Sequence, residues 1–130
     1  MIAAQLAQLF ATAGLSPCGP VGWGEPCPER QPGIYVVTDA NAVIYIGRTK
    51  RPLAKRLREF YRHQYGNRSP HRGGQAVLKV TGERWVYWCP TADPRGAERT
   101  LLQAFLSLTG SLPLANRRRG DRAQATAVAH

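Results

Sequence analysis

Two short runs that favour β-strands, at 33–38 and 43–47, constrain the fold of this chain more than any other feature. Both runs are rich in Ile, Val and Tyr, and only residues 39–42 separate them. The separating segment contains Asp39 and Asn41, whose side chains bond to nearby backbone N–H groups and so favour turns. The sequence therefore predicts a β-hairpin, against which the other elements must pack.

Each run carries a tyrosine, Tyr35 in the first and Tyr45 in the second. Because successive side chains of a strand point to opposite faces, the loop decides how the two tyrosines are related. They share a face if the connection has an odd number of residues, and they lie on opposite faces if it has four. We expect the odd case, which would place two hydroxyl groups on one face of the sheet.

Helical patterns occupy three other stretches of the chain. Apolar residues at helical spacing predict a helix over 2–13, and Gly14 ends it. Pro52 and Pro94 suit the first turns of helices over 52–65 and 94–109. A third strand is expected at 84–89, with 75–80 as an extension into it.

The segment 15–32 contains five Pro and several Gly residues. This content is too high for a regular element, so we expect an ordered loop or a lead-in arm. The predicted fold class is then α/β (α+β), a small three-stranded antiparallel sheet flanked by helices. We expect a helix and arm over 1–32 packed on a domain over 33–119, followed by a frayed tail over 120–130.

Length and hydropathy exclude several classes of protein. A chain of 130 residues forms about one ordinary domain. No apolar run approaches the ~20 residues needed to cross a bilayer. The first basic residue is Arg30, so the start of the chain lacks the basic region of a secretory signal. We expect a cytoplasmic protein with no membrane partner.

The positive charge is concentrated in one part of the chain. The formal net charge is +10, but residues 1–47 carry a balance of −2 and residues 48–122 a balance of +12. Fifteen of the eighteen cations are Arg, whose planar guanidinium binds phosphate bidentately. The distribution favours a nucleic-acid partner, with a solvated basic surface as the alternative.

Glu98 interrupts the apolar face of the predicted helix over 94–109. Leu101, Leu102 and Phe105 follow it at helical spacing, so Glu98 falls near the middle of the inward face. A carboxylate in that position needs a cation. Either the helix N-terminus and an Arg satisfy Glu98, or Glu98 is a metal ligand. We prefer the metal ligand, because a simple cap would more naturally face solvent.

The middle helix carries a similar polar residue, Arg56, at the edge of its apolar stripe. His63 shares the azimuth of Arg56 two turns later. Arg56 would either pair with a carboxylate or act in a site with the two tyrosines and Glu98, where it would bind phosphate. Paired tyrosines on strands can also serve packing alone. On the other face of the helix lie cations that are either solvated or in contact with phosphate: Lys55, Arg58 and Arg62.

These residues together resemble the GIY-YIG nuclease family. Gly33-Ile34-Tyr35 and Tyr45-Ile46-Gly47 lie at hairpin spacing, an Arg and a Glu follow on helices, and Pro113-Leu114-Ala115-Asn116-Arg117 comes after them. The resemblance covers residues 32–119. It implies a metal-dependent endonuclease that hydrolyses phosphodiester bonds in DNA, in repair, restriction or mobile elements. The alternative is a catalytically inactive nucleic-acid-binding module of the same fold. In either case the expected partner is DNA, with structured or single-stranded nucleic acid as further options, and a dimer or a partner subunit is left open.

The resemblance also implies roles for single residues. Tyr35 would be the general base or water-orienting hydroxyl, with Tyr45 assisting it. Glu98 would hold Mg²⁺ or Mn²⁺, Arg56 would stabilise charge on the scissile phosphate, and Asn116 would hold the site together by hydrogen bonds. Phe60 stands where the family often has Tyr or His, so Tyr61 or His63 would substitute, and His63 has the better azimuth. Contacts to the nucleic-acid backbone are expected from Arg48, Lys50, Lys55, Arg58, Arg62, Arg117, Arg118 and Arg119.

Overall fold

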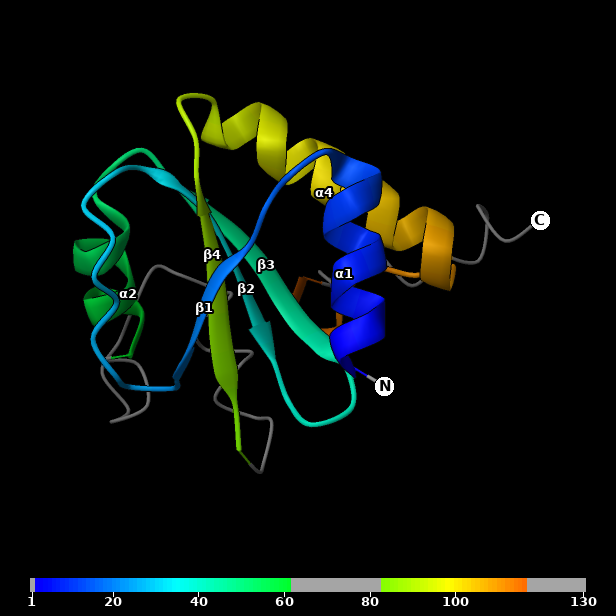
Figure 1. Cartoon of the computed structure of the whole chain (residues 1–130), viewed down its shortest axis with the longest axis horizontal. Coiled ribbons are helices and arrows are strands. Elements are labelled where there is room, and N and C mark those ends of the chain that lie inside the picture. Colours follow the sequence, from blue (N-terminus) through cyan, green and yellow to red (C-terminus); the bar gives the residue numbers. More distant parts are fainter. Residues whose placement is uncertain (1, 62–82, 117–130) are drawn as a thin grey trace.

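The structure of the chain is a computed structural model that describes residues 2–61 and 83–116 (Figure 1). After the first helix come three strands, then a helix, a fourth strand and two further helical segments. They are α1 (Ile2–Ala13), β1 (Cys18–Gly22), β2 (Gly33–Thr38), β3 (Val43–Thr49), α2 (Leu53–Tyr61), β4 (Trp85–Pro90), α4 (Pro94–Thr109) and the 3-10 helix η2 (Leu114–Asn116). The described part is therefore an α+β fold with an antiparallel sheet, as the sequence predicts.

The sheet has four strands in the order β1-β4-β2-β3, so the prediction of three strands was wrong. The additional strand is β1, which lies within the segment expected to lack regular structure. It pairs with β4 at the edge of the sheet, in a register that shifts between Cys18 and Val21. Pro20 cannot donate a hydrogen bond, but an edge strand tolerates it because only one side of the strand is paired.

Helices cover both faces of the sheet (Figure 1). Tyr35 and Val37 of the central strand β2 belong to one core cluster with the buried residues of α2. Ile34 and Val36 belong to a second cluster, with α1 and α4 on the other face. Every residue of β2 is buried. This two-sided burial explains why the strand is almost continuously apolar rather than alternating.

The β2–β3 hairpin contains both the predicted turn and a β-bulge. Asp39 Oδ1 accepts hydrogen bonds from the backbone N–H groups of Asn41 and Ala42, at 2.7 and 2.8 Å. Thr38 pairs with Val43, but Val37 pairs with Tyr45, which leaves Ile44 as an extra residue of β3. The loop itself has four residues, and the bulge adds one residue to β3. This extra residue reverses the face on which the following side chains of β3 lie. Tyr35 and Tyr45 therefore share a face, as we expected.

The three predicted helices are confirmed where the structure describes them. α1 and α4 have the predicted bounds, and α2 covers 53–61 of the predicted 52–65. Residues 62–65 and the predicted strand extension 75–80 lie outside the described residues. In the described part, no helix combines the length and the apolar character needed to cross a membrane.

Candidate active site

The candidate site begins where Tyr35 of β2 reaches across β3. Tyr35 pairs with Gly47, and a Cβ at position 47 would lie 2.5 Å from Tyr35 Cζ and 2.6 Å from its hydroxyl oxygen. Real Cβ contacts are essentially never shorter than 3.0 Å, so position 47 has no room for a side chain. Gly47 thus allows the Tyr35 ring to lie over β3. Gly33 has an equally local reason, because a Cβ there would collide with the Cys89 carbonyl oxygen of β4.

Phe60 of α2 supports both tyrosines of the site. Its ring stacks on Tyr45, with centroids 5.5 Å apart and an interplanar angle of 18°. It meets Tyr35 edge to face at 5.5 Å, and the two tyrosine rings are 6.0 Å apart. The ring of Phe60 is completely buried. The residue that cannot transfer a proton is therefore packed at the centre of an aromatic cluster.

The two residues expected to substitute for Phe60 have different outcomes. Tyr61 packs against Trp23, with ring centroids 4.9 Å apart. Its hydroxyl is buried and makes no hydrogen bond with a described residue. Burial is the main cause that raises the pKa of Tyr61, and neighbouring Cys27 raises it further. His63 lies outside the described residues.

Arg56 and Glu98 act electrostatically on both tyrosines of the site. Burial raises the pKa of Tyr35, the Arg56 guanidinium lowers it, and the Glu98 carboxylate raises it. The pKa of Tyr45 is also raised, first by burial and then by Tyr35 and Glu98. The Tyr35 hydroxyl is buried and makes no hydrogen bond of ordinary geometry with a described residue. Both phenols are therefore protonated at neutral pH in the free protein.

Glu98 approaches the site from α4 and is bound by Arg48, near the end of β3. Arg48 Nη1 donates a hydrogen bond to Glu98 Oε1 at 2.5 Å, and the Glu98 side chain is only 16% exposed. An Arg thus satisfies the carboxylate, as in the alternative weighed for Glu98. Arg56, in contrast, forms no ion pair with residues of the described part. Its charge remains available to an anion.

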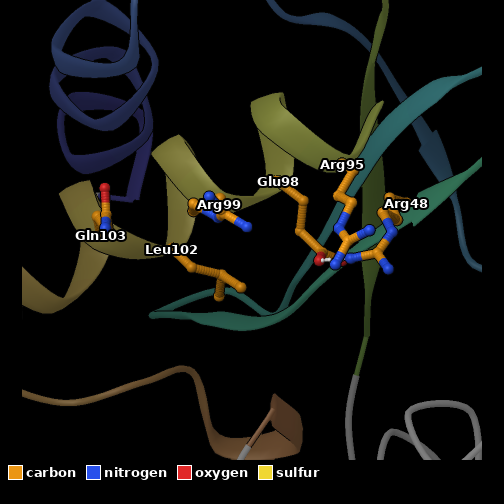
Figure 2. Close-up of a pocket in the computed structure, with 6 residues that line it drawn as sticks. All are labelled: Arg48, Arg95, Glu98, Arg99, Leu102 and Gln103. Carbon is orange, nitrogen blue, oxygen red and sulfur yellow. Dashed lines mark hydrogen bonds and ion pairs between the residues drawn. The ribbon is translucent and has the colours of Figure 1, made fainter. Parts of the chain in front are cut away.

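Glu98 and Arg48 open onto a hollow of about 320 Å³. Figure 2 shows the Arg95 and Arg48 side chains beside the Glu98 carboxylate, and Arg99 one turn of α4 after Arg95. Arg95 and Arg99 were not predicted as site residues from the sequence. A signal was present, because positions 95, 99 and 103 recur every four residues and so lie on one side of a helix.

Glu98 is the residue expected to hold a metal ion. Across residues 2–61 and 83–116, no three His, Cys, Asp or Glu side chains gather in a way that could hold one. Mg²⁺ is commonly bound by one or two carboxylates, with waters and substrate phosphates completing its shell. A single carboxylate that borders an open hollow, as Glu98 does, fits that kind of site, but its Oε1 is bound by Arg48.

Asn116 of η2 binds the backbone of β3 at Ile46. Its Oδ1 accepts from the Ile46 N–H at 2.8 Å, and its Nδ2 donates to the Ile46 carbonyl oxygen, also at 2.8 Å. These two bonds fix β3 between Tyr45 and Gly47.

The predicted contacts to nucleic acid are divided between two surfaces. Lys55 and Arg58 are exposed on α2, on one face of the sheet, and Lys50 is exposed just after β3. Arg48 is exposed but bound to Glu98, on the α4 side. The remaining predicted contacts lie outside the described residues: Arg62, Arg117, Arg118 and Arg119.

The chain matches no protein-family model, no curated protein and no solved structure.

Proposed function

We propose that this protein is a cytoplasmic, metal-dependent endonuclease with a GIY-YIG nuclease-like fold, which hydrolyses phosphodiester bonds in DNA. The observation that carries the proposal is the convergence of Tyr35, Tyr45, Arg56 and Glu98. A hairpin and two helices, on opposite faces of the sheet, supply these four groups. They are close enough to one another for Arg56 and Glu98 to shift the pKa of both phenols.

The four groups have the chemistry that the reaction requires. Hydrolysis of a phosphodiester needs an attacking water, donors for the non-bridging oxygens and positive charge near the leaving oxygen. Protonated Tyr35 and Tyr45 would orient water and phosphate by hydrogen bonds. Arg56 would bind a non-bridging oxygen, and its charge lowers the pKa of Tyr35 against the effect of burial. Once the Tyr35 proton has passed to solvent, the phenolate would take a proton from the attacking water. Mg²⁺ or Mn²⁺, held by Glu98, would supply the charge near the leaving oxygen.

Arg48 has two partners in this proposal. In the free protein it neutralises Glu98. A phosphate offers the same guanidinium a bidentate partner, so substrate would draw Arg48 away and free Oε1 for the cation. Arg48 would then contact phosphate, as the resemblance implies, and metal binding without DNA would be weak.

Plasmid nicking tests the proposal, with Glu98→Gln as the informative variant and Glu59→Gln as its matched control. Glu59 also pairs with an Arg, through hydrogen bonds of 2.9 and 2.5 Å from Arg51, but on the outer side of α2. With Mg²⁺ or Mn²⁺, we expect Glu98→Gln to lose about 10²–10³-fold in rate, as when one electrostatic group of an active site is removed. Glu59→Gln should cleave like the wild type. Wild-type protein no more active than Glu98→Gln, with both metals and several DNA structures, would refute the proposal.

A catalytically inactive nucleic-acid-binding module is the second candidate. Three observations favour it: Phe60 cannot transfer a proton, the Tyr35 hydroxyl is buried, and Arg48 already holds Glu98. This candidate predicts DNA affinity that falls steeply with salt, because bound cations are released from each neutralised phosphate. It also predicts no metal-dependent cleavage by the wild type. The nicking assay therefore separates the two candidates.

A further inference from the structure

The exposed side of α4 carries three long polar side chains in register. Arg95, Arg99 and Gln103 are each exposed and stand four residues apart, a rise of about 6 Å per step. All three line the hollow that also contains Glu98 (Figure 2). The hollow therefore extends along α4, away from the proposed reaction centre.

The charge in this hollow is not balanced. Glu98 is the one acidic residue of its lining, and Arg48 binds it. Arg95 and Arg99 form no ion pair with any residue that the structure describes. Two guanidinium groups thus stand beside the site with no protein anion to neutralise them, and phosphate is the anion that fits their planar, bidentate geometry.

A second hollow of about 300 Å³ continues the basic surface past the start of α4. Arg95 lines both hollows, and the second also contains Lys50 and Asp93. Asp93 is committed to the helix, because its Oδ1 accepts a hydrogen bond from the Gly96 N–H at 3.1 Å. Lys50 and Arg95 therefore extend the positive surface in the direction opposite to Gln103.

The basic side of α2 is a weaker candidate for binding phosphate. It lies on the opposite face of the sheet from α4 (Figure 1). Its carboxylate Glu59 binds Arg51, and its pKa is lowered first by that hydrogen bond and also by the charges of Arg56 and Lys55. An acidic residue thus already compensates part of the positive charge on α2.

We propose that the polar residues along this surface bind successive phosphates of one nucleic-acid strand. They form what we call the phosphate track: Lys50, Arg95, Arg99 and Gln103. The track would extend in both directions from the phosphate that is cleaved beside Glu98. This inference rests on the proposed function. The helical step of about 6 Å is of the same order as the separation of neighbouring phosphates along a strand. The substrate class is consequently an oligonucleotide or longer strand, rather than a mononucleotide or a small phosphodiester.

The test measures binding of fluorescent single-stranded and duplex DNA over a series of salt concentrations, without a divalent cation. The informative variant is Arg95→Gln with Arg99→Gln, and the comparison variant on the opposite face of the sheet is Lys55→Gln with Arg58→Gln. Each double variant removes two exposed cations and leaves polar side chains in their place. For duplex DNA, loss of two phosphate contacts should make the log–log salt slope shallower by about 1.8, from about 0.9 per phosphate. The α2 variant, which removes two of the backbone contacts that the resemblance implies, should change slope and affinity less than the α4 variant does.

A variant that binds DNA more strongly than the wild type provides a test that misfolding cannot explain. Gln103→Lys adds a cation to the track and should steepen the salt slope by about 0.7 for single strands or 0.9 for duplex. Gln5→Lys makes the same change on the exposed side of α1 and should not.

The outcomes also separate this inference from the proposed function. If the α4 double variant binds like the wild type, or if the α2 variant loses as much, the track is refuted even when the wild type cleaves DNA. If the track variants behave as expected but the wild type never cleaves, the track stands and the endonuclease fails.

Discussion

The Tyr35 hydroxyl is buried and makes no hydrogen bond of ordinary geometry with the residues that the structure describes. An unsatisfied buried group costs on the order of 1–3 kcal/mol of folding free energy. Such a cost is expected where a group is kept for chemistry rather than for stability. A substitution at Tyr35 can therefore distinguish a role in chemistry from a role in stability.

Tyr35→Phe should abolish DNA cleavage without weakening the fold. Because the hydroxyl makes no hydrogen bond of ordinary geometry with a described residue, its removal should leave the free energy of unfolding unchanged or raise it by up to about 1 kcal/mol. Chemical denaturation and plasmid nicking measure the two effects. Tyr87→Phe, in β4 on the other face of the sheet from Tyr35, should keep wild-type cleavage. A Tyr35→Phe protein that is less stable and still cleaves would contradict this reading.

Gly47→Ala should destabilise the fold through a collision with the Tyr35 ring. Overpacking of this kind costs about 1–3 kcal/mol, and the ring must shift from its place over β3. Denaturation of Gly47→Ala, Tyr35→Ala and the double variant gives the coupling between the two positions. Since the second substitution removes the ring, the double variant should be more stable than the sum of the single effects predicts. Strict additivity would show that the ring is not what excludes a side chain.

The sequence predicts where Glu98 stands, but not what binds it. Helical periodicity places Glu98 on the inward side of α4, because only the 3.6-residue repeat is needed. Its partner Arg48 is 50 residues earlier in the chain, at the far end of β3. That pairing depends on how a helix crosses a sheet, which local patterns do not determine. Arg95 and Arg99 were not predicted, because exposed arginines are common on helices. The sequence alone does not show that these two line a hollow beside Glu98.

At the scale of elements, helices and hairpin were predictable and two details of the sheet were not. The bulge at Ile44 leaves no mark in the sequence, since the turn residues and apolar residues are the same with or without it. The strand β1 was missed because Pro and Gly normally interrupt strands. An edge strand needs hydrogen bonds on one side only, so Pro20 costs it little.

Asn116→Ala should loosen β3, because it removes two hydrogen bonds to the Ile46 backbone. We expect a loss of about 1–3 kcal/mol in the free energy of unfolding. Asn116→Asp should cost more above about pH 4, where a carboxylate faces the Ile46 carbonyl oxygen. Asn41→Ala, in the exposed hairpin turn, should change stability by less than about 0.5 kcal/mol. Equal effects at positions 41 and 116 would show that the bonds to Ile46 do not hold β3.

For the molecule as a whole, buried phenols and thiols should make the fold sensitive to alkali. Burial raises the pKa of Tyr35, Tyr45 and Tyr61 in the folded state. The unfolded chain then releases these protons first, so the free energy of unfolding should be constant at lower pH and fall above about pH 10. The buried thiols of Cys27 and Cys89, whose pKa is also raised, should contribute in the same direction from about pH 8.5.

Denaturant midpoints between about pH 8 and 11 measure this loss, at up to about 1.4 kcal/mol per pH unit for each group. Tyr61→Phe removes one of the groups and should make the decline less steep. Stability that stays constant through this range would mean that these phenols ionise while the protein remains folded.

The hydrogen bonds of Asn116 have a further consequence for association between copies of this chain. An uncovered outer strand invites another chain to add its own strand. The Asn116 amide offers Ile46 one donor and one acceptor, as a neighbouring backbone would, and so occupies part of that template with a single side chain. If the chain of charge +10 binds DNA as proposed, many copies would lie close together along it. An outer strand that is already partly hydrogen-bonded would then make pairing between the copies less favourable.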